Sequence, residues 1–190
     1  MSGRGEIVVI GTSTGALHAL SQILPALPAE FRVPILVVVH LPAGKDNLMV
    51  ELMASRCALP VREAEDKEPI ESGVIYFAPP DYHLLVEPDR RMSLSVEDPI
   101  NFSRPSIDPL FESAADVFGE GTVGVILTGA SRDGSAGLRA VADAGGITIV
   151  QNPDSAEASV MPMAAVEQCF NSRSVPLDQI ASMLVEVVLP

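Results

Sequence analysis

The sequence predicts an α/β fold, a doubly wound and mostly parallel sheet with helices on both faces and a small antiparallel excursion. Its apolar runs are short and rich in β-branched residues, as at residues 34–39, and segments with helical periodicity separate them regularly. Strands buried on both faces of a parallel sheet, joined by crossover helices, produce this pattern. With 190 residues, of which 47% are hydrophobic, the chain suits one well-packed core, so residues 1–190 are expected to form a single domain.

The first third of the chain alternates between strand and helix. Leucine and isoleucine fall on one face of the first expected helix, and Pro25 and Pro28 close it. The expected elements, in order, are a strand at residues 6–10, a helix at 15–24, a strand at 34–39, a helix at about 46–57 and a short strand near 59–63.

The pattern changes from residue 73 to residue 96, where short extended pieces are joined by Pro- and Asp-containing turns. We interpret the pieces at 74–77, 82–87 and 91–96 as the antiparallel excursion. The parallel pattern then resumes with a helix that Ser106 or Asp108 caps. The remaining expected elements are that helix to about residue 118, a strand at 123–127, a helix at 134–144, a strand at 147–150 and helices at 162–170 and 177–188.

The charge balance argues against nucleic acid or an anionic membrane as partner. The chain has 12 Lys and Arg residues against 25 Asp and Glu, a formal net charge of −13, whereas both partners require a basic face. The longest apolar runs, at residues 33–39 and 122–127, are too short for a membrane helix, and no targeting segment is visible. Cys57 and Cys169 lie far apart without metal-ligand spacing, which indicates neither a zinc site nor a disulfide framework and fits a reducing cytoplasm. The acyl-transfer chemistry expected of the residues described next requires no metal or cofactor.

Polar side chains follow three of the expected strands, where the loops of a parallel sheet gather reactive groups. Ser13 lies in Gly-Thr-Ser-Thr-Gly, the G-x-S-x-G pattern between a strand and a helix, where a tight turn exposes the hydroxyl. The backbone N–H of Thr14 then points toward a developing oxyanion. The alternative is a glycine-rich turn in which Ser13 or Thr14 only caps the helix.

His40 and Asp133 end or follow two further strands and complete a possible triad with Ser13. Taken alone, His40 is a core histidine or a base in the same crevice, and Asp133 is a cap of the helix after it or the partner of the base. The order Ser, His, Asp differs from that of α/β-hydrolases, but triad geometry recurs on unrelated topologies. A dinucleotide site is disfavoured because His40, rather than an acidic residue, follows the second strand.

Two other side chains are possible substrate contacts. His83, in the antiparallel region, is the rival base, and Arg104 precedes the helix near residue 107. Arg104 holds a carboxylate-rich substrate or is an exposed arginine without a role. His18 follows Ser13 by five residues within the first helix and is expected to face away from the crevice.

Several ordered blocks together resemble the catalytic domain of the chemotaxis protein-glutamate methylesterases, the CheB family. Blocks at consistent spacing are far more specific than one G-x-S-x-G. They lie at residues 10–15, 40–42, 73–79 with 83–84, 104–111, 124–129 with 133–134, and 144–145 with 161–162.

The resemblance implies a cytoplasmic enzyme that hydrolyses glutamate γ-methyl esters on the cytoplasmic domains of chemoreceptors and often deamidates receptor glutamines. The family's nucleophile, histidine and aspartate fall on Ser13, His40 and Asp133, and its oxyanion donors on the backbone N–H groups of Thr14 and Ala130. The chain departs from the family at residues 16–17 and 130–131. The family's usual N-terminal receiver domain is not expected in residues 1–190, which form an excised domain or a stand-alone paralogue.

Two other functions remain open at this stage. The first alternative is a non-hydrolytic adaptor that docks a receptor-like helix, which an intact Ser13, His40 and Asp133 disfavour. The second is a serine esterase with an unrelated substrate. An acidic surface suits an acidic receptor helix only where a local basic patch exists. Arg104, Arg132 and Arg139 are the expected residues of such a patch.

Overall fold

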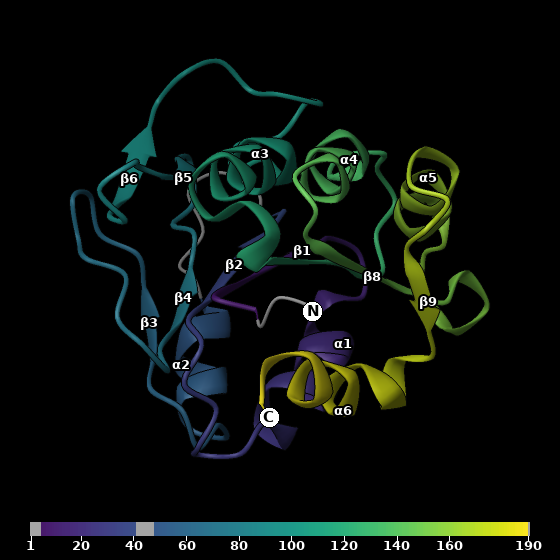
Figure 1. The fold of residues 1–190 in the computed structure, drawn as a ribbon, viewed down its shortest axis with the longest axis horizontal. Helices are drawn as coiled ribbons and strands as arrows, with labels where there is room; N and C mark the ends of the chain where they lie inside the picture. Colours follow the sequence, from purple (N-terminus) through teal and green to yellow (C-terminus); the bar gives the residue numbers. More distant parts are fainter. Residues whose placement is uncertain (1–4, 41–47, 190) are drawn as a thin grey trace.

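One parallel sheet organises the molecule (Figure 1). The computed structural model describes residues 5–40 and 48–189, and in this part of the chain seven strands pair in the order β3-β4-β2-β1-β7-β8-β9. Every pair in this sheet is parallel. The strands are β1 (Ile7–Thr12), β2 (Ile35–Val39), β3 (Val61–Glu63), β4 (Ile75–Phe77), β7 (Thr122–Ile126), β8 (Ile147–Gln151) and β9 (Arg173–Val175).

Helices cover both faces of the sheet because successive residues of its strands point to opposite sides (Figure 1). Val8 and Ile10 pack in the core under α1, α2 and α6, whereas Ile7 and Val9 belong to the core under α3, α4 and α5. The helices are α1 (Ala16–Ile23), α2 (Leu48–Ala54), α3 (Ile107–Phe118), α4 (Ser135–Asp143), α5 (Val160–Gln168) and α6 (Leu177–Val188), with 3-10 turns at Leu24–Ala26, Gly119–Gly121 and Pro153–Ser155.

The doubly wound fold is confirmed, but one strand was expected in the wrong place. The run at residues 74–77 does not join the antiparallel excursion; β4 pairs in parallel between β3 and β2. Its three side chains are all buried, as in a strand covered on both faces, and this burial favours the central sheet. The excursion consists of β5 (His83–Val86) and β6 (Met92–Ser95), which pair antiparallel.

Two further points concern the limits of the elements. The strand β9 was not expected, because its three residues include an exposed Arg173 and Ser174 and carry no apolar run. Residues 41–47, which include Leu41, Pro42 and the expected beginning of the second helix, lie outside the described residues. No helix within residues 5–40 and 48–189 is long and apolar enough to cross a bilayer.

Candidate active site

The carboxyl ends of the central strands bring the three predicted catalytic positions to one edge of the sheet. Thr12 on β1 is the register partner of Val39 on β2, so Ser13 and His40 occupy the next positions on neighbouring strands. The His40 N–H donates to the Thr12 carbonyl oxygen (3.2 Å), and the Ser13 N–H donates to the carbonyl oxygen of Thr128 in the loop after β7 (3.0 Å). Ser13 therefore lies between the strand that carries His40 and the loop that leads to Asp133.

The glycine turn after β1 is held in a conformation that a larger residue could not adopt. Gly15 has φ of 87°, and a Cβ there would lie 2.9 Å from side-chain atoms of both Glu157 and Thr128. The Thr128 hydroxyl donates to the Thr14 carbonyl oxygen (2.9 Å) and fixes the turn. Gly15 itself occupies the N-cap of α1, and no side chain caps that helix. The capping interpretation of Ser13 and Thr14 is therefore not supported.

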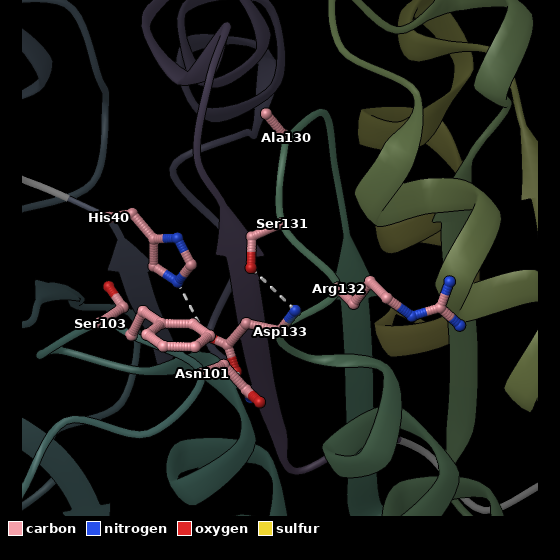
Figure 2. Close-up of a pocket in the computed structure, with 8 residues that line it drawn as sticks. His40, Asn101, Ser103, Ala130, Ser131, Arg132 and Asp133 are labelled. Carbon is pink, nitrogen blue, oxygen red and sulfur yellow. Dashed lines mark hydrogen bonds and ion pairs between the residues drawn. The ribbon is translucent and has the colours of Figure 1, made fainter.

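His40 and Asp133 form a close ion pair. The His40 Nε2 atom lies 2.7 Å from Asp133 Oδ2, the Asp133 side chain is fully buried, and the His40 side chain is 12% exposed (Figure 2). An ionised carboxylate accepts hydrogen bonds only, so Nε2 carries the proton and donates it to Oδ2. The other ring nitrogen, Nδ1, then has a free lone pair, and His40 is poised as a base.

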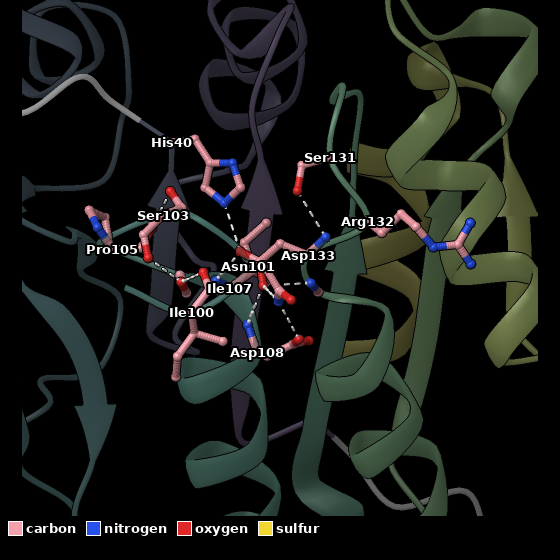
Figure 3. A network of polar contacts seen from close by, with 12 residues as sticks. His40, Ile100, Asn101, Ser103, Pro105, Ile107, Asp108, Ser131, Arg132 and Asp133 are labelled. Atoms are coloured by element: carbon pink, nitrogen blue, oxygen red, sulfur yellow. Dashed lines mark hydrogen bonds and ion pairs between the residues drawn. The ribbon is translucent and has the colours of Figure 1, made fainter. Parts of the chain in front are cut away.

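Asp133 accepts hydrogen bonds on both carboxylate oxygens (Figure 3). Besides His40, Oδ2 accepts the Ile107 N–H (2.6 Å), while Oδ1 accepts the Asn101 side-chain amide (2.8 Å) and the N–H groups of Gly134 (3.0 Å) and Asp108 (3.2 Å). Burial alone raises the pKa of the Asp133 carboxyl, but the hydrogen bonds from His40, Ile107 and Asn101 outweigh it and hold the pKa below its ordinary value.

These contacts revise the choice between a cap and a catalytic partner for Asp133. The carboxylate accepts N–H groups from the first turn of α3, rather than capping α4, the helix that follows it. It therefore caps a distant helix and contacts His40 at the same time. Glycine makes this approach possible, because a Cβ at Gly134 would lie 2.8 Å from the Ile107 side chain and φ at Gly134 is 90°.

An open pocket of about 680 Å³ lies in front of the His40–Asp133 pair (Figure 2). Within the described residues, neither the Thr14 N–H nor the Ala130 N–H donates a hydrogen bond, and both residues are exposed, so both groups can meet a ligand. Ser13 and Thr14 lie beside the pocket rather than in its lining. The lining residues are His40, Asn101, Phe102, Ser103, Ala130, Ser131, Arg132 and Asp133.

His83 and Arg104 lie away from this pocket. His83 is buried, its Nδ1 accepts the Ser106 N–H (3.1 Å), and its Nε2 is 3.1 Å from the Asp98 carbonyl oxygen. The Arg104 guanidinium donates to the carbonyl oxygens of Val96 (3.0 Å) and Glu97 (3.1 Å). Both side chains therefore hold the loop before α3 in place, and this geometry favours a structural role over the substrate contact considered from the sequence.

Sequence reasoning missed Asn101 and Phe102. Asn101 donates to Asp133 and also to Asp108 Oδ2 (2.9 Å), and Phe102 lines the pocket. Neither residue belongs to a periodic pattern, because the loop that holds them makes its contacts with residues distant in sequence. The available signal was the Asn itself, which tolerates the left-handed backbone of a tight turn. Within the described residues, no group of three or more His, Cys, Asp and Glu side chains could hold a metal ion.

Comparisons with known proteins find similar sequences over nearly the whole chain. The family model for CheB methylesterase matches residues 8–184. A Leptospira interrogans protein, named as a candidate protein-glutamate methylesterase/protein-glutamine glutaminase, is 43% identical over 96% of this chain and 94% of its own. A Clostridium acetobutylicum protein-glutamate methylesterase/protein-glutamine glutaminase is 37% identical over 96% of this chain, which spans 53% of that relative.

A solved structure is similar over nearly the whole chain. The crystal structure of the Thermotoga maritima CheB methylesterase catalytic domain matches with a TM-score of 0.93 and 35% identity, over 98% of this chain and 100% of that one. The seven-stranded sheet with its two-stranded antiparallel pair is thus the fold of that catalytic domain.

Proposed function

The chain belongs to the CheB methylesterase family, and on that premise we propose that Ser13, His40 and Asp133 carry out its hydrolysis. The activity of the family is that of a protein-glutamate methylesterase/protein-glutamine glutaminase. The proposed substrate is the glutamate γ-methyl ester, or the glutamine amide, of a chemoreceptor cytoplasmic domain. The observation that carries the proposal is the 2.7 Å contact between His40 and a buried, ionised Asp133. His40 follows β2, the strand that pairs with the one before Ser13.

Acylation begins with transfer of the Ser13 hydroxyl proton to His40. Because His40 Nε2 is hydrogen-bonded to Asp133, the atom that accepts the Ser13 proton is Nδ1. The Ser13 oxygen attacks the ester carbonyl, Asp133 stabilises the resulting imidazolium, and the ring proton passes to the departing methoxide, which leaves as methanol. For a glutamine substrate, the same proton passes to the departing nitrogen, which leaves as ammonia.

Deacylation repeats the sequence with water as the nucleophile. His40 Nδ1 takes a proton from water, the hydroxide attacks the glutamyl ester on Ser13, and the proton returns to the Ser13 oxygen as free glutamate forms. In both steps the carbonyl oxygen carries negative charge in the transition state. The unpaired N–H groups of Thr14 and Ala130 are the proposed donors to it. All of these groups belong to this chain, and the chemistry requires no cofactor.

The experiment is mass spectrometry of methylated receptor cytoplasmic fragments before and after incubation with the protein. Loss of methyl esters and conversion of glutamine to glutamate are expected for the wild type. The Ser13→Ala variant is expected to lose both conversions and also covalent labelling by a fluorophosphonate, with an unchanged circular dichroism spectrum.

Serine-to-alanine variants at Ser131 and Ser103 are the matched controls, because these serines line the pocket whereas Ser13 lies beside it. Labelling that persists in Ser13→Ala and disappears in a control would move the nucleophile to that serine. Receptor fragments left unchanged by a protein that still labels would favour an esterase with an unrelated substrate. A protein that binds the fragments but neither labels nor converts them would favour an adaptor.

The proposed setting is the cytoplasm, where such receptor domains lie. Cys57 and Cys169 are both free thiols, a state that suits a reducing compartment. Burial raises the pKa of the Cys57 thiol, which lowers its reactivity toward oxidants.

A further inference from the structure

The pocket carries an aromatic side chain on an unusual turn. Ile100 and Ser103 exchange two backbone hydrogen bonds, with the Ile100 N–H donating over 3.1 Å and the Ser103 N–H over 3.0 Å. The two residues between them, Asn101 and Phe102, have φ of 51° and 63°. This is a two-residue hairpin loop of the kind that needs left-handed backbone at both central positions.

Phenylalanine is a poor choice for such a turn. Asn at the first central position tolerates left-handed backbone, and Gly is the preferred residue at the second, where Phe102 stands. Phe102 gains no burial in return, since its side chain is fully exposed. Phe102 nevertheless lies beside the proposed catalytic groups, because it lines the pocket together with His40 and Asp133. A solvent-exposed aromatic ring that a strained turn holds beside reactive groups is the kind of side chain that contacts a ligand.

Further apolar side chains are exposed in the same loop and at the adjoining ends of the antiparallel pair. Ile100, in the same turn, is 41% exposed, and Val96, at the end of β6, is 68% exposed. Tyr82 is the next residue in register opposite Val96 and is also exposed. Of these exposed apolar and aromatic side chains, Phe102 is the one that lines the pocket.

We infer that Phe102 is a specificity-determining residue that packs against the substrate residues on either side of the reacting glutamate. The inference rests on the proposed function and names the feature of the substrate that is recognised. Three bonds of about 1.5 Å each join the glutamate Cα to its carbonyl carbon. The substrate backbone must consequently approach the rim of the pocket closely. Side chains next to the glutamate then lie against the rim, where Phe102 stands.

The same turn joins recognition to catalysis through its other central residue. Asn101 donates to Asp133 Oδ1, so the backbone that presents Phe102 is anchored to the carboxylate that holds His40 (Figure 3). A substrate segment packed on Phe102 is thereby positioned relative to the His40 ring. Phe102 itself contacts only the substrate and takes no part in proton transfer.

The test compares Phe102→Gly, Phe102→Tyr and a control, Phe170→Gly. Phe170 is also highly exposed, but it lies between α5 and β9, at the opposite edge of the sheet. We expect Phe102→Gly to lower kcat/KM on a methylated receptor fragment by about tenfold to a hundredfold, the factor that burial of one phenylalanine contributes. The loss on p-nitrophenyl acetate should be much smaller. Phe102→Tyr should keep activity on both substrates, as should Phe170→Gly.

Thermal melting gives a second readout. Glycine relieves the left-handed strain at position 102, so the melting temperature of Phe102→Gly should equal or exceed that of the wild type. Equal losses on both substrates would overturn the inference, because they would show that residue 102 acts through Asp133. An unchanged kcat/KM on the receptor fragment would overturn it as well. A wild type that cleaves only p-nitrophenyl acetate would instead contradict the proposed function, and the inference would fall with it.

Discussion

The beginnings of α3 and α4 each carry a buried carboxylate, and each carboxylate binds the backbone of the other helix. Asp133, just before α4, accepts the N–H groups of Ile107 and Asp108 at the start of α3. Asp108, in the first turn of α3, accepts the Gly137 N–H in α4 over 2.7 Å. The Asn101 side-chain amide donates to both (Figure 3). The two sites share the Asn101 donor and a similar arrangement, yet the pKa of Asp108 is raised whereas the pKa of Asp133 is lowered.

The number of donors decides the direction. Burial raises the pKa of Asp108, the Gly137 N–H opposes it only in part, and the nearby charge of Asp133 adds to the rise. Asp133 is buried more completely, but His40 and three backbone N–H groups donate to it, and its pKa falls instead. Asp133 accepts more hydrogen bonds and therefore keeps its charge to a lower pH than Asp108 does. In the proposed mechanism that charge lies beside His40 and stabilises the imidazolium.

The largest expected effect comes from Asp133→Asn. Because the amide cannot accept from His40 as a carboxylate does, the ring is held in the wrong tautomer, and kcat should fall about ten-thousandfold by analogy with other triads. The NH2 group of the new amide must also replace one carboxylate oxygen and face the N–H groups that donate to it in the wild type. That mismatch should cost about 1–3 kcal/mol of folding free energy. Turnover per folded molecule and urea unfolding measure the two effects. Turnover close to that of the wild type would remove Asp133 from the catalytic machinery.

Asn101→Gly removes the shared donor and leaves the turn intact, because glycine adopts a φ of 51° without strain. A hydrogen bond to a charged group contributes about 1.5–3 kcal/mol, so kcat should fall about tenfold to a hundredfold. The pH profile of kcat/KM should also move, because loss of the Asn101 hydrogen bond raises the pKa of the Asp133 carboxyl. A lower melting temperature with unchanged kcat and an unchanged profile would show that Asn101 serves the fold alone.

The sequence predicted the sheet and its edge well, for a physical reason. Short continuous apolar runs such as residues 35–39 have few structures open to them, and polar residues that follow such strands necessarily gather at one edge. Ser13 and His40 were predicted in this way to share one edge, and they follow neighbouring strands in the structure. The strand β4 was misplaced because its run lies close in sequence to the antiparallel pair, whereas its burial on both faces appears only after folding.

The contacts around Asp133 could not be predicted because they join residues far apart in the chain. Asp133 and Ile107 meet only when α3 and α4 pack side by side, and Gly134 allows that approach. The sequence offered two alternatives for Asp133, a cap of the helix that follows it or the partner of His40. In the structure its carboxylate caps α3 rather than α4 and also contacts His40. Asn101 gave even less warning, since one amide in an irregular loop has no pattern to reveal it.

The smallest effect on activity is expected from Asp108→Asn, which changes the carboxylate of α3 and leaves Asp133 in place. The amide oxygen can still accept the Gly137 N–H, so kcat should fall by no more than about tenfold, the cost of one disturbed hydrogen bond to Asn101. The informative measurement is the pH dependence of stability. The raised pKa of Asp108 means that its charge destabilises the folded protein at pH values above that pKa.

As pH falls through that raised pKa, the wild type takes up a proton and loses the penalty, so Asp108→Asn should become less stable relative to the wild type. Asp133 has a lowered pKa, and its contribution is complete above its unfolded value near 3.8 and disappears as pH falls through the folded value. The deficit of Asp133→Asn should therefore shrink on acidification while that of Asp108→Asn grows. Melting curves of both variants, with Glu112→Gln as the control for the neighbouring carboxyl with a raised pKa, measure the two slopes, and slopes of equal sign would refute the division of charge between the two sites.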